Sequence, residues 1–146
     1  MSAPDFQLDP RLVRRRAGRA AAGYSGVDTL AREISRRMAE RLEYIRIEPK
    51  RILDLGCGPG ADLATFATRY PGVARVAIDS APAMLAQARG EKNLLKRLMS
   101  FGKPAEPDFV CAEASALPLA RGSVSFAWSN LMLQWLHDPL PALKEI

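Results

Sequence analysis

The sequence predicts an α/β fold in which a mostly parallel sheet is covered by helices on both faces. Short apolar runs alternate along the chain with amphipathic segments of helical spacing. A glycine-rich turn follows the first of these runs, in "ILDLGCGPG", residues 52–60. Parallel strands need helical crossovers, and their sheet is buried on both faces, so its strands are apolar throughout.

The helices and strands are predicted from local patterns. From Val27 to Ile45 apolar residues recur at steps of three and four, which mark one face of a helix. Asp28 and Ser80 are the expected N-caps of the first and third helices. In chain order, we expect a helix over 27–45, a strand over 51–55, a helix over 61–70, a strand over 74–79 and a helix over 81–89. A segment of helical spacing over 91–101 follows, then strands over 108–114 and 123–130, and a helix from 139.

The composition is that of a globular domain. The chain has 146 residues, of which 48% are apolar and 25% charged, and no apolar run approaches the ~20 residues that cross a bilayer. We therefore expect no contact with a membrane. Cys57 and Cys111 form no CxxC or metal-ligand pattern, which favours a reducing, cytoplasmic location and no metal site.

The beginning of the chain is strongly basic. The stretch "RLVRRRAGR", residues 11–19, contains five arginines and no acid, in a chain of net charge +5. We expect residues 1–26 to be a basic N-terminal arm and residues 27–146 to be the folded domain. Such an arm suits nucleic acid, an anionic membrane or an acidic protein, and a solvated, partly frayed arm is the alternative.

The glycine turn predicts a ligand that contains a ribose. In open α/β sheets, ligands bind beyond the carboxyl ends of the strands, where Asp54, the turn and Asp79 would lie. Asp79 follows Gly60 by 19 residues, close to the ~20 residues typical of an acid that binds ribose hydroxyls. A pyrophosphate is disfavoured, because the third glycine comes one place early, Pro59 lacks an N–H group and no Gly-Lys-Ser/Thr follows.

These motifs resemble those of class I S-adenosylmethionine-dependent methyltransferases. "LDLGCGPG" is similar to their first motif, Asp79 to the acid that closes their second strand, and "AEASALPL" to their third-strand motif, with Glu113 where aspartate is usual. The resemblance implies S-adenosylmethionine as the cofactor and a Rossmann-like sheet of which this chain holds the first four of seven strands.

The resemblance also implies roles for individual residues. Gly56 and Gly58 would let the backbone approach the methionine moiety, Asp54 would orient its amino group and Asp79 would hold the ribose. Met84 would lie against adenine, Glu113 and the Ala114 amide would contact the adenine edge, and Asn130 would border the departing methyl group. The implied cofactor-binding set is Asp54, Gly56, Cys57, Gly58, Gly60, Asp79, Ser80, Met84, Glu113, Ala114 and Asn130.

Structural interpretations of four of these residues stay open. Asp54 is also suited to cap the turn, and Cys57 to be a small turn residue. Helical spacing with Leu85 favours a core position for Met84. Glu113 is also consistent with a solvated loop acid.

The methyl acceptor is predicted from a narrower resemblance. "AGRAAAGY", residues 17–24, and "FAWSNLMLQW", residues 126–135, are similar to malonyl-acyl-carrier-protein O-methyltransferases of biotin biosynthesis. Ala17 departs from the phenylalanine usual there, and the segment 91–107 is a second departure. The implied acceptor is the carboxylate of a malonyl thioester on an acidic carrier protein, which the arginine-rich arm would suit.

No catalytic residue is assigned. A carboxylate acceptor is ionised at neutral pH and needs no general base, and the single histidine, His137, is expected to be a surface or capping residue. Two other functions stay open. One is a non-catalytic, methyltransferase-like scaffold similar to complex I assembly factors. The other, less favoured, is a nucleic-acid methyltransferase that uses the basic arm.

The last predicted helix reaches Ile146 without a terminating glycine, asparagine or proline. We therefore expect a chain that is incomplete at its C-terminus. The unpaired edge of "SVSFAW", residues 123–128, would then favour self-association, and this 146-residue chain would methylate slowly if at all.

Overall fold

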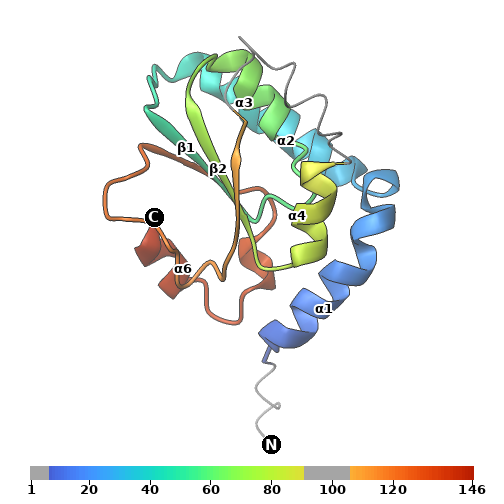
Figure 1. The fold of residues 1–146 in the computed structure, drawn as a ribbon. Coiled ribbons are helices and arrows are strands. Elements are labelled where there is room, and N and C mark those ends of the chain that lie inside the picture. The colour runs from blue at the N-terminus through green and yellow to red at the C-terminus, as the bar shows by residue number, and fades with distance from the viewer. Residues whose placement is uncertain (1–6, 91–105) are drawn as a thin grey trace, which may run out of the picture.

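A four-stranded, wholly parallel sheet forms the centre of the molecule (Figure 1). The computed structural model describes residues 7–90 and 106–146. The strand order is β3-β2-β1-β4, so β1 has β2 on one side and β4 on the other. The strands are β1 (Arg51–Leu55), β2 (Ala74–Asp79), β3 (Asp108–Cys111) and β4 (Phe126–Trp128).

Helices lie on both faces of this sheet, as the alternating sequence pattern predicts (Figure 1). Side chains of α3, α4 and η2 pack on one face, and α6 with the segment after β3 packs on the other. The helices are α1 (Pro10–Ala20), α2 (Thr29–Arg41), α3 (Leu63–Arg69), α4 (Pro82–Arg89) and α6 (Leu140–Glu145), with 3₁₀ turns η1 (Ala21–Gly26), η2 (Leu42–Tyr44) and η3 (Leu133–Trp135). No helix among the described residues is long and apolar enough to cross a membrane.

The alternation of side chains along the strands divides the core in two. Leu53 and Ile78 point to the face covered by Ala142 of α6. Ile52 and Trp128 point to the opposite face, where the ring of Phe66 from α3 packs edge-on against Trp128 at 5.2 Å between centroids. Burial on both sides explains why these strands are continuous apolar runs.

The predicted strands over 51–55 and 74–79 coincide with β1 and β2, whereas β3 and β4 are shorter than predicted. The predicted helical segment at 91–101 lies outside the described residues. Of the two N-cap predictions, the position of Asp28 is confirmed, although its side chain makes no capping hydrogen bond, and that of Ser80 is wrong. Ala81, not Ser80, precedes α4, and Asp28 precedes α2 but pairs its carboxylate with Arg32 at 2.8 Å.

The predicted apolar face over 27–45 is only partly buried. Val27 and Leu30 are 77% and 67% exposed, while Ser35 and Leu42 are buried. The inward face of α2 is set by Ser35, because its hydroxyl donates to the buried carboxylate of Asp62 at the start of α3. A polar contact of this kind leaves no trace in hydrophobic spacing.

Residues 10–26 fold against the domain. Asp9 caps α1 by accepting a hydrogen bond from the Arg11 amide at 2.8 Å. The helix then runs beside α4 (Figure 1), and Ala17, Ala21 and Tyr24 enclose Met84. The basic stretch is therefore a packed helix and not a frayed arm.

Candidate functional site

The candidate site lies where the strand order reverses. β1, β2 and β3 follow one another across the sheet, and β4 adds on the other side of β1. The carboxyl ends of the strands at such a switch point are the usual ligand site of open α/β sheets. A cavity of about 280 Å³ opens there, lined by Leu55, Asp79, Ala114 and residues of the segment after β4. This volume lies at the low end of the ~300–1,000 Å³ typical of ligand pockets.

The glycine turn offers no free backbone donor to an anion. The amides of Gly56 and Cys57 both donate to the Ile78 carbonyl, at 2.8 and 3.0 Å. The Gly58 amide donates to Asp79 and the Gly60 amide to the Cys57 carbonyl at 2.9 Å. Since Pro59 has no N–H group, the turn cannot cradle a phosphate as a P-loop does. This agrees with the prediction of a ligand without phosphates.

The three glycines of the turn have positive φ angles but different surroundings. A Cβ atom on Gly56 would collide with the Met132 side chain, and one on Gly60 would lie 2.9 Å from Leu63 Cδ1. A Cβ atom on Gly58 would meet nothing within 4 Å. Glycine is therefore needed at positions 56 and 60 because neighbouring side chains pack closely against the backbone. At Gly58 the backbone is uncovered and borders open space.

Asp79 is held in position by the turn. Its Oδ2 accepts a hydrogen bond from the Gly58 amide at 2.9 Å and its Oδ1 accepts one from the Ala81 amide at 2.8 Å. The residue also lines the cavity. An ionised carboxylate has about four acceptor positions, so two remain for ligand hydroxyl groups.

Asp54 is a buried carboxylate with an unpartnered oxygen. It is 2% exposed, and its Oδ2 has no hydrogen-bond partner. Burial, with the charges of Asp62 and Asp79 nearby, raises the pKa of Asp54 to about 8. A cationic donor placed here would satisfy the oxygen and favour ionisation.

A buried polar network lies on the same side of the sheet. Asp62 accepts hydrogen bonds from the Ser35 hydroxyl and, at 2.7 Å, from the Trp128 indole N–H. After β4, Asn130 donates to the Ala31 carbonyl at 2.9 Å, while its Oδ1 is buried without a partner. The next residue, Leu131, has a φ of 55°, and such strain is concentrated at functional sites.

Glu113 and Ala114 lie on the far wall of the cavity, after β3. Glu113 Oε1 is 3.4 Å from Arg14 Nη1, in an ion pair whose side chains are 41% and 46% exposed. This pair joins α1 to the loop beyond β3. Glu113 is therefore a partnered acid that stays partly exposed to solvent.

Cys57 and Met84 are both buried. Burial and the nearby charges of Asp54 and Asp79 raise the pKa of the Cys57 thiol, which keeps it protonated and unreactive. Met84 packs with Ala21 and Ala81. These surroundings favour a structural role for both residues, Cys57 in the turn and Met84 in the core. Their predicted contacts with a cofactor stay predictions.

The structure brings part of the predicted set together. Gly56, Asp79, Ser80, Glu113 and Ala114 line the cavity. The other predicted positions, which do not line it, are Asp54, Cys57, Gly58, Gly60, Met84 and Asn130.

Several lining residues were not predicted. Pro10 and Val13 reach the cavity from α1, and Met132 and Trp135 reach it from the segment after β4. The exposed His137 also lines it. The apolar stretch "LMLQWL", residues 131–136, could have indicated that the segment after β4 lines a cavity. Nothing in the residue spacing of α1 indicates that this helix contributes lining residues. Among the described residues no cluster of histidine, cysteine and acids could hold a metal ion.

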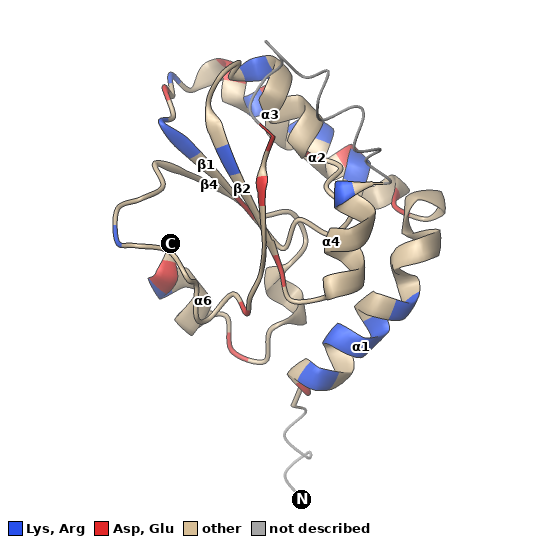
Figure 2. Cartoon of the chain, viewed as in Figure 1, with Lys and Arg blue, Asp and Glu red and all other residues tan. Residues whose placement is uncertain are grey.

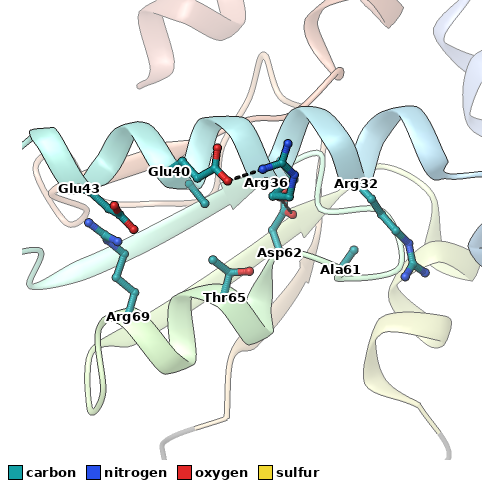
Figure 3. Close-up of a pocket in the computed structure, with 10 residues that line it drawn as sticks. Arg32, Arg36, Glu40, Glu43, Ala61, Asp62, Thr65 and Arg69 are labelled. Carbon is teal, nitrogen blue, oxygen red and sulfur yellow. Dashed lines mark hydrogen bonds and ion pairs between the residues drawn. The ribbon is translucent and has the colours of Figure 1, made fainter.

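A second cavity, of about 450 Å³, lies between α2 and α3 (Figure 3). Its arginines have partners in the chain. Arg32 pairs with Asp28, Arg36 with Glu33 and Glu40, and Arg69 donates to the Tyr70 hydroxyl. Because the charges of Arg32 and Arg36 are balanced within the chain, this cavity has the character of a solvated surface groove.

Comparisons with known proteins identify relatives of the whole chain. The family model described as "Methyltransferase domain" matches residues 53–146. The malonyl-acyl-carrier-protein O-methyltransferase of Methylovorus sp. (strain MP688) is 36% identical over 146 residues, which are 100% of this chain and 48% of that protein. The protein of the same name from Gallionella capsiferriformans (strain ES-2) is 40% identical over 138 residues, 94% of this chain and 46% of that protein. This chain thus spans about half the length of the curated relatives it matches.

A solved structure supports the fold. It is described as "Complex between the Haloferax volcanii Trm112 methyltransferase activator and the putative methyltransferase". The TM-score is 0.70, with 23% identity over 92% of this chain and 54% of that chain.

Proposed function

Because the chain belongs to the methyltransferase domain family, we propose that it binds S-adenosylmethionine and serves methyl transfer to a carboxylate. The acceptor we propose is the malonyl group of an acyl carrier protein, as in the names of the relatives. The reaction would belong to biotin biosynthesis in the cytoplasm. Both cysteines are free thiols, which is consistent with a reducing compartment.

The observation that carries this proposal is the unpartnered, buried Oδ2 of Asp54. A buried polar atom without a partner is costly and calls for a ligand or water. S-adenosylmethionine has an α-ammonium group that can donate to it. When bound, this cofactor supplies a methyl group activated on a sulfonium.

The other contacts follow from the cavity. Asp79, fixed by the Gly58 and Ala81 amides, would accept from the ribose hydroxyls. Glu113 and the Ala114 amide would contact the adenine edge from the opposite wall. The open space over Gly58 would admit the methionine moiety. Because the cavity is small, we expect it to hold the nucleoside part of S-adenosylmethionine, with the methionine part lying outside it.

The chain's own residues do not need to remove a proton. A carboxylate acceptor is ionised at neutral pH, so the requirement is position and exclusion of water. Met132, Trp135 and Leu136 supply apolar surface on the wall after β4. His137 lies on the rim and is left without a required role.

Methyl transfer with labelled cofactor tests the proposal. The protein, expressed from its complete reading frame, is incubated with malonyl carrier protein, with RNA, or with neither. Label on the carrier that is released by mild base, as a methyl ester would be, supports the proposal. Label on RNA would contradict it in favour of a nucleic-acid methyltransferase, and cofactor binding without turnover would favour a scaffold.

A further inference from the structure

The outward face of α1 is a row of exposed arginines. Arg11, Arg15 and Arg19 follow one another at intervals of four residues, which places them on one line along the helix. Arg16 is exposed beside them. A rise of 1.5 Å per residue makes this row about 12 Å long. Figure 2 shows the basic positions along α1. Arg11, Arg15, Arg16 and Arg19 together form the arginine face of the helix.

This face carries unbalanced charge. Within residues 7–90 and 106–146, no carboxylate forms an ion pair with Arg11, Arg15, Arg16 or Arg19. The helix α2 is also rich in arginine but differs, because Arg36 and Arg37 share the carboxylate of Glu33. The arginine face is therefore available to a partner, whereas most of the charge on α2 is used within that helix.

The opposite side of α1 borders the candidate site. Pro10 and Val13 line the cavity, and Arg14 pairs with Glu113 on its wall at 3.4 Å. An α-helix with its side chains is ~10–12 Å thick, so the arginine face lies about one helix width from the cavity. A partner bound to it would therefore lie close to the cavity.

We propose that the arginine face docks an acidic carrier protein and so presents the carrier-bound carboxylate to the cavity. This rests on the proposed function for the nature of the acceptor. The argument is charge complementarity: a row of like charges without internal partners attracts a surface of opposite sign and speeds its encounter.

Steady-state kinetics with two acceptors test this docking surface. The acceptors are malonyl carrier protein and a short malonyl thioester without the protein. The test variant combines Arg15→Glu and Arg19→Glu, and the matched control is Arg41→Glu, a likewise exposed arginine in the last turn of α2. Circular dichroism melts establish that all three proteins are folded.

The expected result is a rise of KM for malonyl carrier protein of about tenfold or more in the double variant, since steering by charge changes association rates by ~10–10³. Its kcat, and its kcat/KM for the short thioester, stay within about twofold of wild type. The Arg41→Glu control matches wild type with both acceptors. Added salt raises the wild-type KM for the carrier and has less effect on the double variant.

Failure of docking and failure of the proposed function give different results. If the double variant and wild type have the same KM for malonyl carrier protein, the docking surface is wrong while the proposed function stands. If wild type methylates neither acceptor, the proposed function itself is wrong. If the double variant loses affinity for a single-stranded RNA probe but keeps its carrier kinetics, the face binds nucleic acid and the proposal is overturned.

Discussion

The Gly58 amide donates to Asp79 Oδ2 at 2.9 Å, which ties the glycine turn after β1 to the acid that ends β2. A Cβ atom on Gly58 would meet nothing within 4 Å, so the residue that makes this contact borders open space. It also fixes the carboxylate before any ligand arrives, and a preorganised group binds at a lower entropic cost. The turn and the acid thus form one unit.

Replacing Asp54 with asparagine is expected to stabilise the ligand-free protein at high pH. The pKa of Asp54 is raised from 3.8 to about 8, so the folded state holds the proton more tightly than the unfolded chain does. Its contribution to stability is complete below about pH 4 and is lost as the pH rises to 8. Thermal melts of Asp54→Asn and wild type should differ by a few degrees at pH 8, since ~1 kcal/mol shifts Tm by about 2–8 °C, and should converge near pH 4. A lower Tm for Asp54→Asn at pH 8 would contradict this.

Cofactor binding is expected to depend on pH because of Asp54. An ammonium group favours the ionised form of Asp54, so binding from neutral pH should release a proton. Titration calorimetry at pH 7 in buffers of different ionisation enthalpy measures this release. Wild type is expected to release more protons than Asp54→Asn, and equal release by the two would contradict the assigned contact.

Two glycines with positive φ and open surroundings, Gly58 in the glycine turn and Gly72 after α3, separate backbone strain from ligand contact. Gly58 and Gly72 both have positive φ, and a Cβ atom on either would meet nothing within 4 Å. Alanine at either position should therefore cost a similar ~1–2 kcal/mol of stability. Only Gly58→Ala is expected to weaken S-adenosylmethionine binding, by about tenfold or ~1.4 kcal/mol. Equal cofactor affinities of the two variants would show that the space over Gly58 is not used.

Trp128 is expected to stabilise the fold through its N–H group. Trp128→Phe keeps an aromatic ring against Phe66 but removes the donor to the buried Asp62 carboxylate. The cost should be about 1–3 kcal/mol of unfolding free energy, measured by urea denaturation. Trp135→Phe is the matched control, because Trp135 is 55% exposed. A similar loss in both variants would argue against a special role for the Asp62 contact.

The sequence predicts the centre of the fold well because apolar runs and glycine turns are local signals. β1, β2 and the position of Asp79 are confirmed for this reason. The start of α1 had a local signal too, in the Asp9-Pro10 pair that caps it. What could not be predicted depends on contacts between distant elements. The burial of Ser35 depends on its contact with Asp62. The packing of Met132 against Gly56 follows a bend at Leu131, whose φ is 55°.

Titration of S-adenosylmethionine into wild type, Asp79→Ala and Asp108→Ala tests the central claim most directly. Asp108 is the matched control, because it lies at the start of β3, at the opposite edge of the sheet from the cavity. We predict saturable binding by wild type and Asp108→Ala, and a loss of about 1.5–3 kcal/mol in Asp79→Ala, as for a hydrogen bond to a charged group. No saturable binding by the wild-type protein, or the same affinity in Asp79→Ala as in wild type, would contradict a cofactor site at the carboxyl edge of this sheet.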